Sequence, residues 1–364
     1  MNMRYASVCS GVEAPTVAWH PLGWKPQFFS EIEKFPSAVL EHHYPDVPNH
    51  GDMLNYKDWP EYDKANGIQL LVGGTPCQSF SVAGLRQGLD DPRGNLMLTF
   101  LGVAKKYNPK WIIWENVPGV LSSNRGRDFG TFLTALGQIG YGFAYRVCDA
   151  QYWGVAQRRR RVFVVGCLGD WRRAAAVLFE RESLSGHPAP SREARERLAD
   201  TLTVGANQYS GFIGEPVEAV TYGIPDNWIG RAPENGGNAT KPMNDIAPNL
   251  TSADRHAMAF QQNTRDEVRY INGDGQIAGA LSANGGMKQT NYLQSDMQVR
   301  RLTPRETERL QGFPDNYTQI PWRNKAPEDC PDGPRYKAMG NSMAVPVMRW
   351  IGERIAMVDK RCYS

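Results

Sequence analysis

The fold is decided by one stretch of the sequence, Leu70-Leu71-Val72-Gly73-Gly74-Thr75-Pro76-Cys77-Gln78-Ser79-Phe80-Ser81. Its apolar run predicts a short buried strand, which breaks at the Gly-Gly pair and the Pro-Cys dipeptide that follow. Cys77 therefore lies on a stiff turn at the carboxyl end of a strand, the place where open α/β sheets bind ligands. A cysteine there is a candidate nucleophile; the alternative for any single cysteine is a small buried hydrophobe.

Stretches typical of strands alternate with stretches typical of helices on both sides of this turn. We expect strands at 5–9, 26–30, 68–72, 111–114, 143–147 and 162–165, and helices at 14–20, 96–107, 129–139, 171–182 and from 31–33 through 40. This alternation predicts an α/β fold with a doubly wound sheet.

The first turn of this sheet has the pattern of a nucleoside site. Ser10 and Gly11 follow the first strand, and Glu31 comes about twenty residues later, where a carboxylate can take ribose hydroxyls. The full Gly-x-Gly-x-x-Gly signature is absent, which favours a nucleoside-bearing cofactor without a pyrophosphate. An ordinary strand-to-helix turn with a surface glutamate is the alternative.

Composition is that of a soluble globular protein, with 41% hydrophobic and 22% charged residues in 364. Between 199 and 296 there are 6 Lys or Arg against 11 Asp or Glu, and the net charge of the whole chain is +3. The remainder therefore carries about +8, and a polyanion site is expected to draw on Arg158 to Arg161, Arg172 and Arg173.

Neither a metal nor a membrane is expected. The 6 cysteines are scattered without a Cys-x-x-Cys pair, and His42 and His43 lack spaced partners, so these histidines are expected at the surface. The N-terminus has no apolar signal core, and no apolar run reaches the length of a membrane span. These features predict a cytoplasmic protein.

A different composition begins after residue 183. Residues 183–190 have the character of a linker, and from there to about 298 the chain is rich in Gly, Asn, Ala, Thr and Pro, which predicts short strands and long loops. Thr303, Pro304 and Glu306 then form the start of a helix with a capping box, which we expect to end near Gln311. A last loop at 340–342 is expected to precede a helix over 345–357.

With these residues in place, the chain resembles the DNA (cytosine-5)-methyltransferase family nearly end to end, in the family's motif order. The resemblance is carried by Gly74-x-Pro76-Cys77-Gln78, Asp91-x-Arg93-Gly94-x-Leu96, Glu115-Asn116-Val117, Gln157-x-Arg159-x-Arg161, the helix within Arg301 to Gly312, and Gly340-Asn341-Ser342. It implies a mostly parallel, Rossmann-like methyltransferase sheet with a smaller, loop-rich, mainly β target-recognition domain. The implied domains are 1–168 and 335–364, which together form the catalytic domain, and 169–334, which holds the recognition domain and its supporting helix.

The resemblance also implies a reaction. Cys77 would add to carbon 6 of a cytosine flipped out of duplex DNA, which makes carbon 5 nucleophilic toward the methyl group of S-adenosylmethionine. Glu115 would hydrogen-bond the ring nitrogen and the exocyclic amine, and Arg161 the carbonyl oxygen of the base. Arg159 would hold either Glu115 or a phosphate. The base that removes the proton from carbon 5 is not identified, and water is one option.

Further site residues follow from the same motifs. Those expected to bind S-adenosylmethionine are Cys9, Ser10, Gly11, Glu31, Ile32, Asp52, Met53, Gly74, Pro76, Leu96, Asn341 and Ser342. Those expected to contact DNA are Gln78, Ser79, Ser81, Arg93, Gln157 and Arg158. Arg158 and Arg160 alternate with the motif arginines, so on a strand they point the opposite way and are solvated or face phosphates.

Two positions near the first strand depart from the family pattern. Cys9 stands where an aromatic residue is usual, and Glu13 replaces a glycine. We expect cofactor binding to survive through Glu31, Asp52 and backbone groups, with lower affinity.

Three other functions are compatible with parts of the sequence. An RNA cytosine methyltransferase shares the fold, but a long insert before Arg300 favours a reader of duplex DNA. An inactive DNA-binding descendant is disfavoured by the intact Cys77 and Glu115, and a cysteine hydrolase by the lack of a paired histidine. A monomer is expected, with a restriction endonuclease as a possible partner. The recognition sequence and the biological role are left open.

Overall fold

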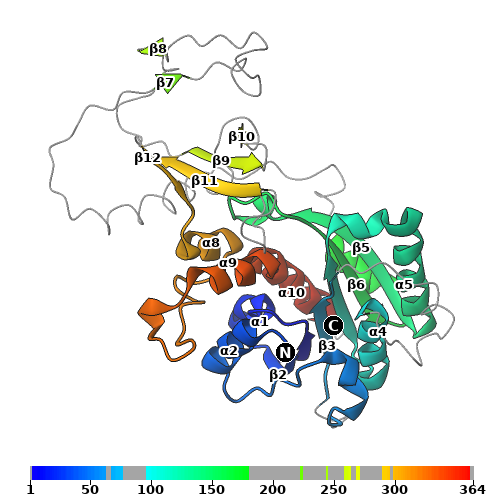
Figure 1. Ribbon diagram of the computed structural model, residues 1–364. Coiled ribbons are helices and arrows are strands. Elements are labelled where there is room, and N and C mark those ends of the chain that lie inside the picture. Colours follow the sequence, from blue (N-terminus) through cyan, green and yellow to red (C-terminus); the bar gives the residue numbers. More distant parts are fainter. Residues whose placement is uncertain are drawn as a thin grey trace.

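The structure is a computed structural model (Figure 1). It describes residues 2–62, 67–76, 96–179 and 301–360 with their side chains, and the backbone of six strands between 222 and 301. Cys77 and the rest of the segment 77–95 lie outside the described residues.

The centre of the molecule is a six-stranded sheet in the order β2-β1-β3-β4-β6-β5. Its strands are β1 (Arg4–Val8), β2 (Lys25–Ser30), β3 (Leu70–Gly74), β4 (Trp111–Asn116), β5 (Tyr141–Asp149) and β6 (Arg160–Leu168). The chain reverses its direction across the sheet between β1 and β3, where Val8 lies opposite Gly73. Ligands bind at such a switch point in open α/β sheets.

β6 is antiparallel to both of its neighbours, and the other pairings are parallel. The connection from β5 to β6 contains only the 3-10 turn η6 (Ala150–Trp153) and a few further residues. Antiparallel strands accept such a short connection, whereas a parallel crossover needs a dozen or more residues. The expected doubly wound, mostly parallel sheet is confirmed, with one reversed strand.

Helices cover both faces of the sheet (Figure 1). They are α1 (Ala14–Trp19), α2 (Lys34–His43), α4 (Leu96–Tyr107), α5 (Arg127–Gln138), α6 (Trp171–Leu178), α8 (Pro304–Gln311), α9 (Asp332–Asn341) and α10 (Val345–Lys360). Short 3-10 turns are η1 (His20–Leu22), η2 (Met53–Asp58), η4 (Pro118–Leu121), η5 (Ser123–Gly126) and η11 (Pro327–Asp329). Among the described residues, no helix is long and apolar enough to span a bilayer.

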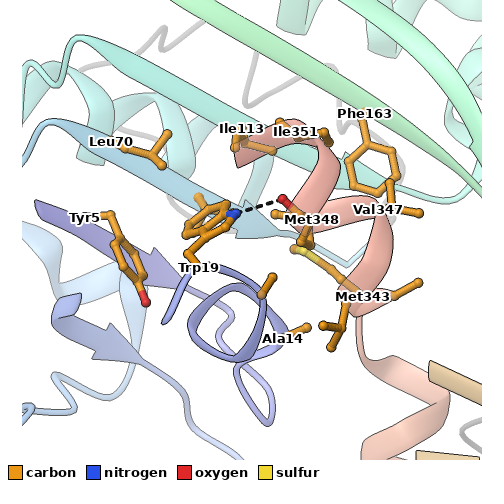
Figure 2. Close-up of a cluster of buried hydrophobic side chains, with 14 of the residues drawn as sticks. Tyr5, Ala14, Trp19, Leu70, Ile113, Phe163, Met343, Val347, Met348 and Ile351 are labelled. Atoms are coloured by element: carbon orange, nitrogen blue, oxygen red, sulfur yellow. Dashed lines mark hydrogen bonds between the residues drawn. The ribbon is translucent and has the colours of Figure 1, made fainter. Parts of the chain in front are cut away.

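Alternate side chains of the strands fill two hydrophobic cores, one on each face. Leu70 and Ile113 pack under α1 and α10, while Leu71 and Trp114 pack under α4 and α5. Figure 2 shows the first core, where the indole Nε1 of Trp19 donates to the carbonyl oxygen of Met348 at 2.7 Å. This bond joins the first helix of the chain to its last.

The C-terminal helix is tied to the sheet by one buried carboxylate. Asp359 on α10 forms ion pairs with Lys110 and Arg173, each at 2.7 Å, and accepts a hydrogen bond from Trp111. A charge inside a protein is tolerated when it is paired and hydrogen-bonded in this way. The final helix is thus built into the same body as the N-terminal strands.

Several expected boundaries agree with the structure. The helix at 96–107 is confirmed, and Thr303, Pro304 and Glu306 form the expected capping box of α8. The helix expected over 171–182 is described to Leu178, and β4 is longer than expected, so that it includes Glu115.

The expected loop at 340–342 is wrong in part. Gly340 and Asn341 form the end of α9, and Ser342 is its C-cap. The sequence Asp332-Gly333-Pro334 has the appearance of a turn, but glycine and proline are tolerated in the first turn of a helix, and α9 begins there.

The insert contains strands, as expected. A four-stranded antiparallel sheet has the order β10-β9-β11-β12, and the pair β7 (Tyr222–Gly223) and β8 (Met243–Asn244) is separate from it. The four strands are β9 (Met258–Asn263), β10 (Val268–Tyr270), β11 (Gln289–Ser295) and β12 (Gln298–Arg301). β12 leads directly into α8, which lies beside α9 in Figure 1.

Candidate active site at the carboxyl edge of the sheet

The candidate site lies where β1, β3 and β4 end. Gly74 is the last residue of β3 and lies opposite Glu115 on β4, one residue before that strand ends. Glu115 in turn faces Phe163 on β6, so the start of β6 meets the same edge of the sheet. The turns that leave β1 and β3 therefore converge with the motifs of β4 and β6.

The turn before Cys77 is fixed from the side by β4. Trp114 Nε1 donates to the hydroxyl of Thr75 at 2.9 Å, and Asn116 Nδ2 donates to the carbonyl oxygen of Thr75 at the same distance. Two neighbouring side chains of one strand thus hold the residue that stands two positions before the candidate nucleophile. Of the expected DNA-contacting residues, Gln78, Ser79, Ser81 and Arg93 lie outside the described residues, as Cys77 does.

Glu115 is an almost buried carboxyl group beside two arginines. Its Oε1 lies 2.9 Å from Arg161 Nε, and the residue is 7% exposed. Burial raises its pKa, while the positive charges of Arg161 and Arg159 act in the opposite direction. A carboxyl group with a raised pKa is suited to donate a proton to a bound base.

Gly74 leaves the space that Glu115 occupies. A Cβ atom at this position would lie 2.9 Å from Glu115 Oε2 and 3.1 Å from Met343 Cε. Steric crowding therefore explains the glycine at this position of the nucleophile motif, because any side chain would clash with the Glu115 carboxyl group. Gly74 was expected to bind the cofactor, and the structure places it against Glu115.

Arg159 has hydrogen-bond partners that the sequence did not indicate. Its Nη1 donates to the carbonyl oxygen of Gly340 at 3.1 Å and its Nη2 to that of Ser342 at 2.6 Å, both at the end of α9. The side chain is buried, and burial lowers its pKa to about 9. Its acceptors in the structure are thus carbonyl groups at a helix C-terminus, while its positive charge also acts on Glu115. The expected role of Arg159 toward Glu115 or a phosphate stays a prediction.

The side chain of Gln157 is fully buried, and neither of its amide atoms has a hydrogen-bond partner in the structure. The expected contact of Gln157 with DNA stays a prediction. Arg158 and Arg160 are exposed while Gln157 and Arg159 are buried, so the expected alternation is confirmed.

The turn after β1 has an unusual backbone. Cys9, Gly11 and Glu13 all have positive φ, at 49°, 57° and 64°. The N–H of Gly11 donates to Glu31 Oε2 at 2.8 Å, and that of Glu33 donates to Glu31 Oε1 at 2.7 Å. Glu31 thus ties the first turn to the end of β2.

A nucleoside fits the groups around this turn. Glu31 keeps acceptor capacity at both oxygens, and the side chain of Ile32 beside it is 68% exposed, which offers an apolar surface to a flat base. A Cβ on Gly11 would have no neighbour within 4 Å, so the turn borders open space. These features are those that an adenosine moiety needs.

Other residues expected at the cofactor lie near this turn. Asp52 caps η2 by accepting from the N–H of Leu54, and the Cys9 thiol donates to Met53 Sδ at 3.3 Å. Burial raises the pKa of Cys9 to about 12, so its thiol stays neutral. Asn49, which the sequence did not single out, accepts from the backbone N–H of Glu31.

Five more residues expected at the cofactor have mixed positions. The hydroxyl of Ser10 donates to the carbonyl oxygen of Ser7 beneath the turn, and Leu96 begins α4. Ser342 is buried with its hydroxyl bound to the carbonyl oxygen of Met343, while Pro76 and Asn341 are exposed. Two of them also make contacts distant in sequence, because the carbonyl oxygen of Ser342 accepts from Arg159 and the hydroxyl of Ser10 accepts from the backbone N–H of Ser30.

Glu13 is a fully buried carboxyl group directly beneath the turn. The Thr16 hydroxyl donates to its Oε1 at 3.1 Å, and its Oε2 has no partner. Burial raises its pKa to about 8, so the group is mainly protonated at neutral pH. The replacement of the family's glycine thus places a neutral acid in a left-handed backbone position.

The histidines of α2 do not behave alike. His42 is exposed, as expected, but His43 is half-buried and stacks on Tyr317 with ring centroids 4.1 Å apart. Tyr317 in turn donates to the carbonyl oxygen of Val12 in the first turn. No cluster of three or more His, Cys, Asp or Glu side chains suited to a metal occurs among the described residues.

Arg172 and Arg173 lie at the opposite edge of the sheet. They follow the carboxyl end of β6, which is antiparallel to β4 and therefore ends where β4 begins. Arg173 is paired with Asp359. Grouping these two arginines with Arg158 to Arg161 as one polyanion site is therefore wrong.

The sheet order, the nucleoside-type turn after β1 and the buried acid on β4 define the class of protein as a Rossmann-like methyltransferase. The solved structure titled Schizosaccharomyces pombe Dnmt2 methyltransferase has the same fold, with a TM-score of 0.58 and 15% identity over 100% of both chains. The chain belongs to the C-5 cytosine-specific DNA methylase family, whose model matches residues 3–357. The resemblance stated from the motifs is confirmed, and with it the enzyme class of a DNA (cytosine-5)-methyltransferase.

Two relatives of known sequence illustrate the range of the similarity. The Type II methyltransferase M1.ScrFI of Lactococcus lactis subsp. cremoris is 30% identical over 92% of this chain and 72% of its own length. A protein of Escherichia phage P1 named DNA N-6-adenine-methyltransferase is 35% identical over 97% of this chain. The chain spans 61% of the length of that phage protein.

Proposed function

We propose that the protein methylates carbon 5 of a flipped-out cytosine in a specific sequence of duplex DNA, through a covalent adduct with Cys77. The observation that carries this proposal is the placement of Glu115. Its carboxyl group lies against Gly74, three residues before Cys77, and Arg161 holds it in place. The fixed turn at Thr75 supplies the second element, because it sets where the nucleophile begins.

The proposed reaction uses these groups in order. The Cys77 thiolate forms a bond to carbon 6, and the displaced electron pair moves toward carbon 5 while Glu115 donates to the ring nitrogen. Carbon 5 takes the methyl group as the bond between that group and the donor sulfur breaks. Water then removes the proton from carbon 5, and the electron pair of the broken C–H bond restores the double bond between carbon 5 and carbon 6 and expels the Cys77 thiolate. The ring nitrogen returns its proton to Glu115, so that atoms and charges balance.

S-adenosylmethionine is the proposed methyl donor, and it supplies an electrophilic methyl sulfonium. Gly11, Glu31 and Ile32 would hold its adenosine moiety, with Asp52 and Met53 at the border of the same turn. Holding the donor beside the end of β3 orients its methyl group toward carbon 5 and lowers the entropic part of the barrier.

The proposed domain arrangement follows the sequence boundaries. Residues 1–168 and 335–364 form the catalytic domain, and residues 169–334 hold the target-recognition domain with α8 as its support. The contacts of Asp359 with Lys110 and Trp111 support the inclusion of the C-terminal segment. α9 begins at Asp332, so the last boundary lies a few residues earlier than proposed from the sequence.

The Type II relatives support a restriction endonuclease as a functional partner, and a monomer is proposed for an enzyme that modifies one base at a time. RNA methylation is the related alternative within this fold. The length of the insert before Arg300 favours duplex DNA over RNA as the substrate, whereas its acidic charge does not. A direct assay with both nucleic acids distinguishes the two substrates.

A second candidate function is methylation of adenine N6, because the phage P1 relative has that name. Transfer of a methyl group to an exocyclic amine needs no covalent addition to the ring. A cysteine nucleophile would have no role in that reaction. The phage protein is also longer than the region matched here. We therefore favour cytosine as the substrate.

The test is nucleoside mass spectrometry and bisulfite sequencing of plasmid DNA from cells that express the protein. Cys77→Ala is the inactive control, and Cys362→Ala is a matched cysteine control outside the family match. We expect 5-methylcytosine in one sequence context, present with Cys362→Ala and absent with Cys77→Ala. N6-methyladenine without 5-methylcytosine would overturn the proposal in favour of the second candidate.

A duplex with 5-fluorocytosine at the modified position tests the adduct itself. Fluorine cannot leave carbon 5 as a proton does, so the bond from Cys77 to carbon 6 should persist after methyl transfer. We expect a protein–DNA species that survives denaturing electrophoresis for the wild type and is absent for Cys77→Ala. Methylation of normal DNA without this species would contradict the covalent route.

A further inference from the structure

We propose that four arginines beside the active site, Arg125, Arg127, Arg158 and Arg160, form one surface that binds the phosphate backbone of the duplex. We call these residues the arginine surface. The inference rests on the proposed function and adds to it the loop after β4, which carries Arg125 and Arg127 and belongs to none of the motifs above.

The loop after β4 begins at the catalytic edge of the sheet. Glu115 and Asn116 end that strand, and η4 and η5 follow directly. The loop therefore leaves the same edge of the sheet at which Thr75 and Gly74 lie. Arg125 and Arg127 are both exposed there.

The four residues of the arginine surface share one face of the sheet. Arg160 has the same parity along β6 as Val162 and Val164, which pack in the core under α4 and α5. Val120 of η4 belongs to that core, and η4 packs against β6. The loop after β4 and the exposed arginines at the start of β6 thus lie on one side of the catalytic edge, and Arg159 lies on the other.

The turn that carries Arg125 has a strained backbone. Asn124 and Arg125 both have positive φ, at 49° and 57°. The buried carboxylate of Asp128 accepts from the hydroxyl of Ser123 and from Asn124 Nδ2, which holds this conformation. Two consecutive residues other than glycine in the left-handed region cost conformational free energy. The turn therefore holds the backbone of Arg125 in one strained conformation, which fixes where its side chain leaves the loop.

The residues of the arginine surface lack acidic partners among the described contacts. None of the four side chains has a carboxylate partner among the described contacts, whereas Arg173 at the opposite edge is paired with Asp359 and Arg161 with Glu115. Segments 117–127 and 150–161 contain no Asp or Glu. Four exposed arginines without acidic partners call for an external anion, and the guanidinium fork matches phosphate oxygens.

The insert before Arg300 has the opposite charge balance to the arginine surface. The segment 199–296 has more acidic than basic residues, 11 against 6, so it repels a duplex on balance. Phosphate contacts supply most of the affinity of a DNA-binding protein and none of its sequence information. The catalytic domain is therefore expected to provide phosphate contacts, and the arginine surface is a cluster of exposed cations at its catalytic edge.

The experiment compares two charge-matched double variants. Arg125→Gln with Arg127→Gln removes two positive charges from the arginine surface, and Lys25→Gln with Arg172→Gln removes two exposed charges from the opposite edge. Binding of a cognate and a non-cognate duplex is measured between about 50 and 200 mM salt. Circular dichroism and titration with S-adenosylmethionine check that both variants are folded and bind the donor.

We expect the first variant to bind both duplexes about tenfold more weakly, and the slope of log affinity against log salt to fall by about one to two units. The control variant should match the wild type in both respects. An unchanged slope, or an equal loss in the control, would overturn the proposal. If the wild type binds a structured RNA more tightly than DNA, and the first variant loses affinity for that RNA to the same extent, the arginine surface would be assigned to RNA instead.

Failure of the proposed function has a different signature. If the wild type binds DNA with a salt slope that the first variant reduces, but makes no 5-methylcytosine, the arginine surface stands and the catalytic assignment fails. If the wild type methylates DNA and the first variant binds as the wild type does, the catalytic assignment stands and the arginine surface is wrong.

Discussion

Arg161 Nε lies 2.9 Å from Glu115 Oε1, and this ion pair links the end of β4 to the start of β6 at the candidate site. The pair opposes the effect of burial, which raises the pKa of Glu115. The ion pair also fixes the direction of the Glu115 carboxyl group, which lies against Gly74, three residues before Cys77 in the sequence. The motif glutamate and the last motif arginine thus act as one unit.

Glu115→Gln should lower kcat for methyl transfer by about 10²- to 10⁴-fold, because an amide cannot pass a proton to the ring nitrogen. The affinity for S-adenosylmethionine should stay within about twofold of the wild type, since Glu115 is remote in sequence and strand from the turn at Gly11. Single-turnover kinetics and isothermal titration measure the two quantities. Glu353→Gln on α10 serves as the control, and a large loss of donor affinity in Glu115→Gln would contradict the assigned role.

Gly74→Ala should reduce activity through Glu115. The added methyl group would lie 2.9 Å from Glu115 Oε2, so the carboxyl group must move or the strand must shift. We expect a fall in kcat of at least about tenfold, corresponding to about 1.4 kcal/mol in the barrier. Gly130→Ala in α5 is the matched control, because a Cβ there has no neighbour within 4 Å. Equal activity of the two variants would show that the contact has no catalytic consequence.

The sequence predicted most of the sheet and helices because local signals were strong there. The run Leu70–Gly74, the helix α4 and the capping box of α8 depend on periodicity and on caps that neighbouring residues define. The reversed direction of β6 and the helix α9 were missed, since the first depends on a short connection and the second begins with glycine and proline.

The site was predictable at the level of motifs and less so at the level of contacts. The motifs bring Glu115 and Arg161 to one edge of the sheet, but their ion pair was not predicted from the sequence. Arg159 binds the carbonyl groups of Gly340 and Ser342, which are about 180 residues away in the sequence. Such a contact depends on how α9 packs, which no local pattern records. The role of Gly74 as a neighbour of Glu115 was hidden for the same reason.

Glu13 should make stability depend on pH in a defined direction. Its pKa in the folded protein is raised to about 8 by burial, whereas the unfolded chain titrates near the ordinary value of 4.5. The folded state therefore binds the proton more tightly, and the stabilising contribution of the protonated group is lost as the pH rises from about 5 to about 8. Glu13→Gln keeps the hydrogen-bonding shape without the titration. Urea unfolding at pH 6, 7, 8 and 9 should show the wild type losing stability relative to this variant, and parallel curves would contradict the prediction.

Asp359→Ala should destabilise the whole catalytic domain, although the residue lies near the end of the chain. The substitution leaves Lys110 and Arg173 without their shared carboxylate and removes the acceptor of Trp111. The two cations left behind are partly exposed, so we expect a loss of about 1–3 kcal/mol and a lower midpoint of urea unfolding. Glu353→Ala on the same helix changes a partly exposed carboxylate and should stay within about 0.5 kcal/mol of the wild type. If both variants unfold like the wild type, α10 does not stabilise the sheet through Asp359, and the proposed assignment of residues 335–364 to the catalytic domain loses its main support.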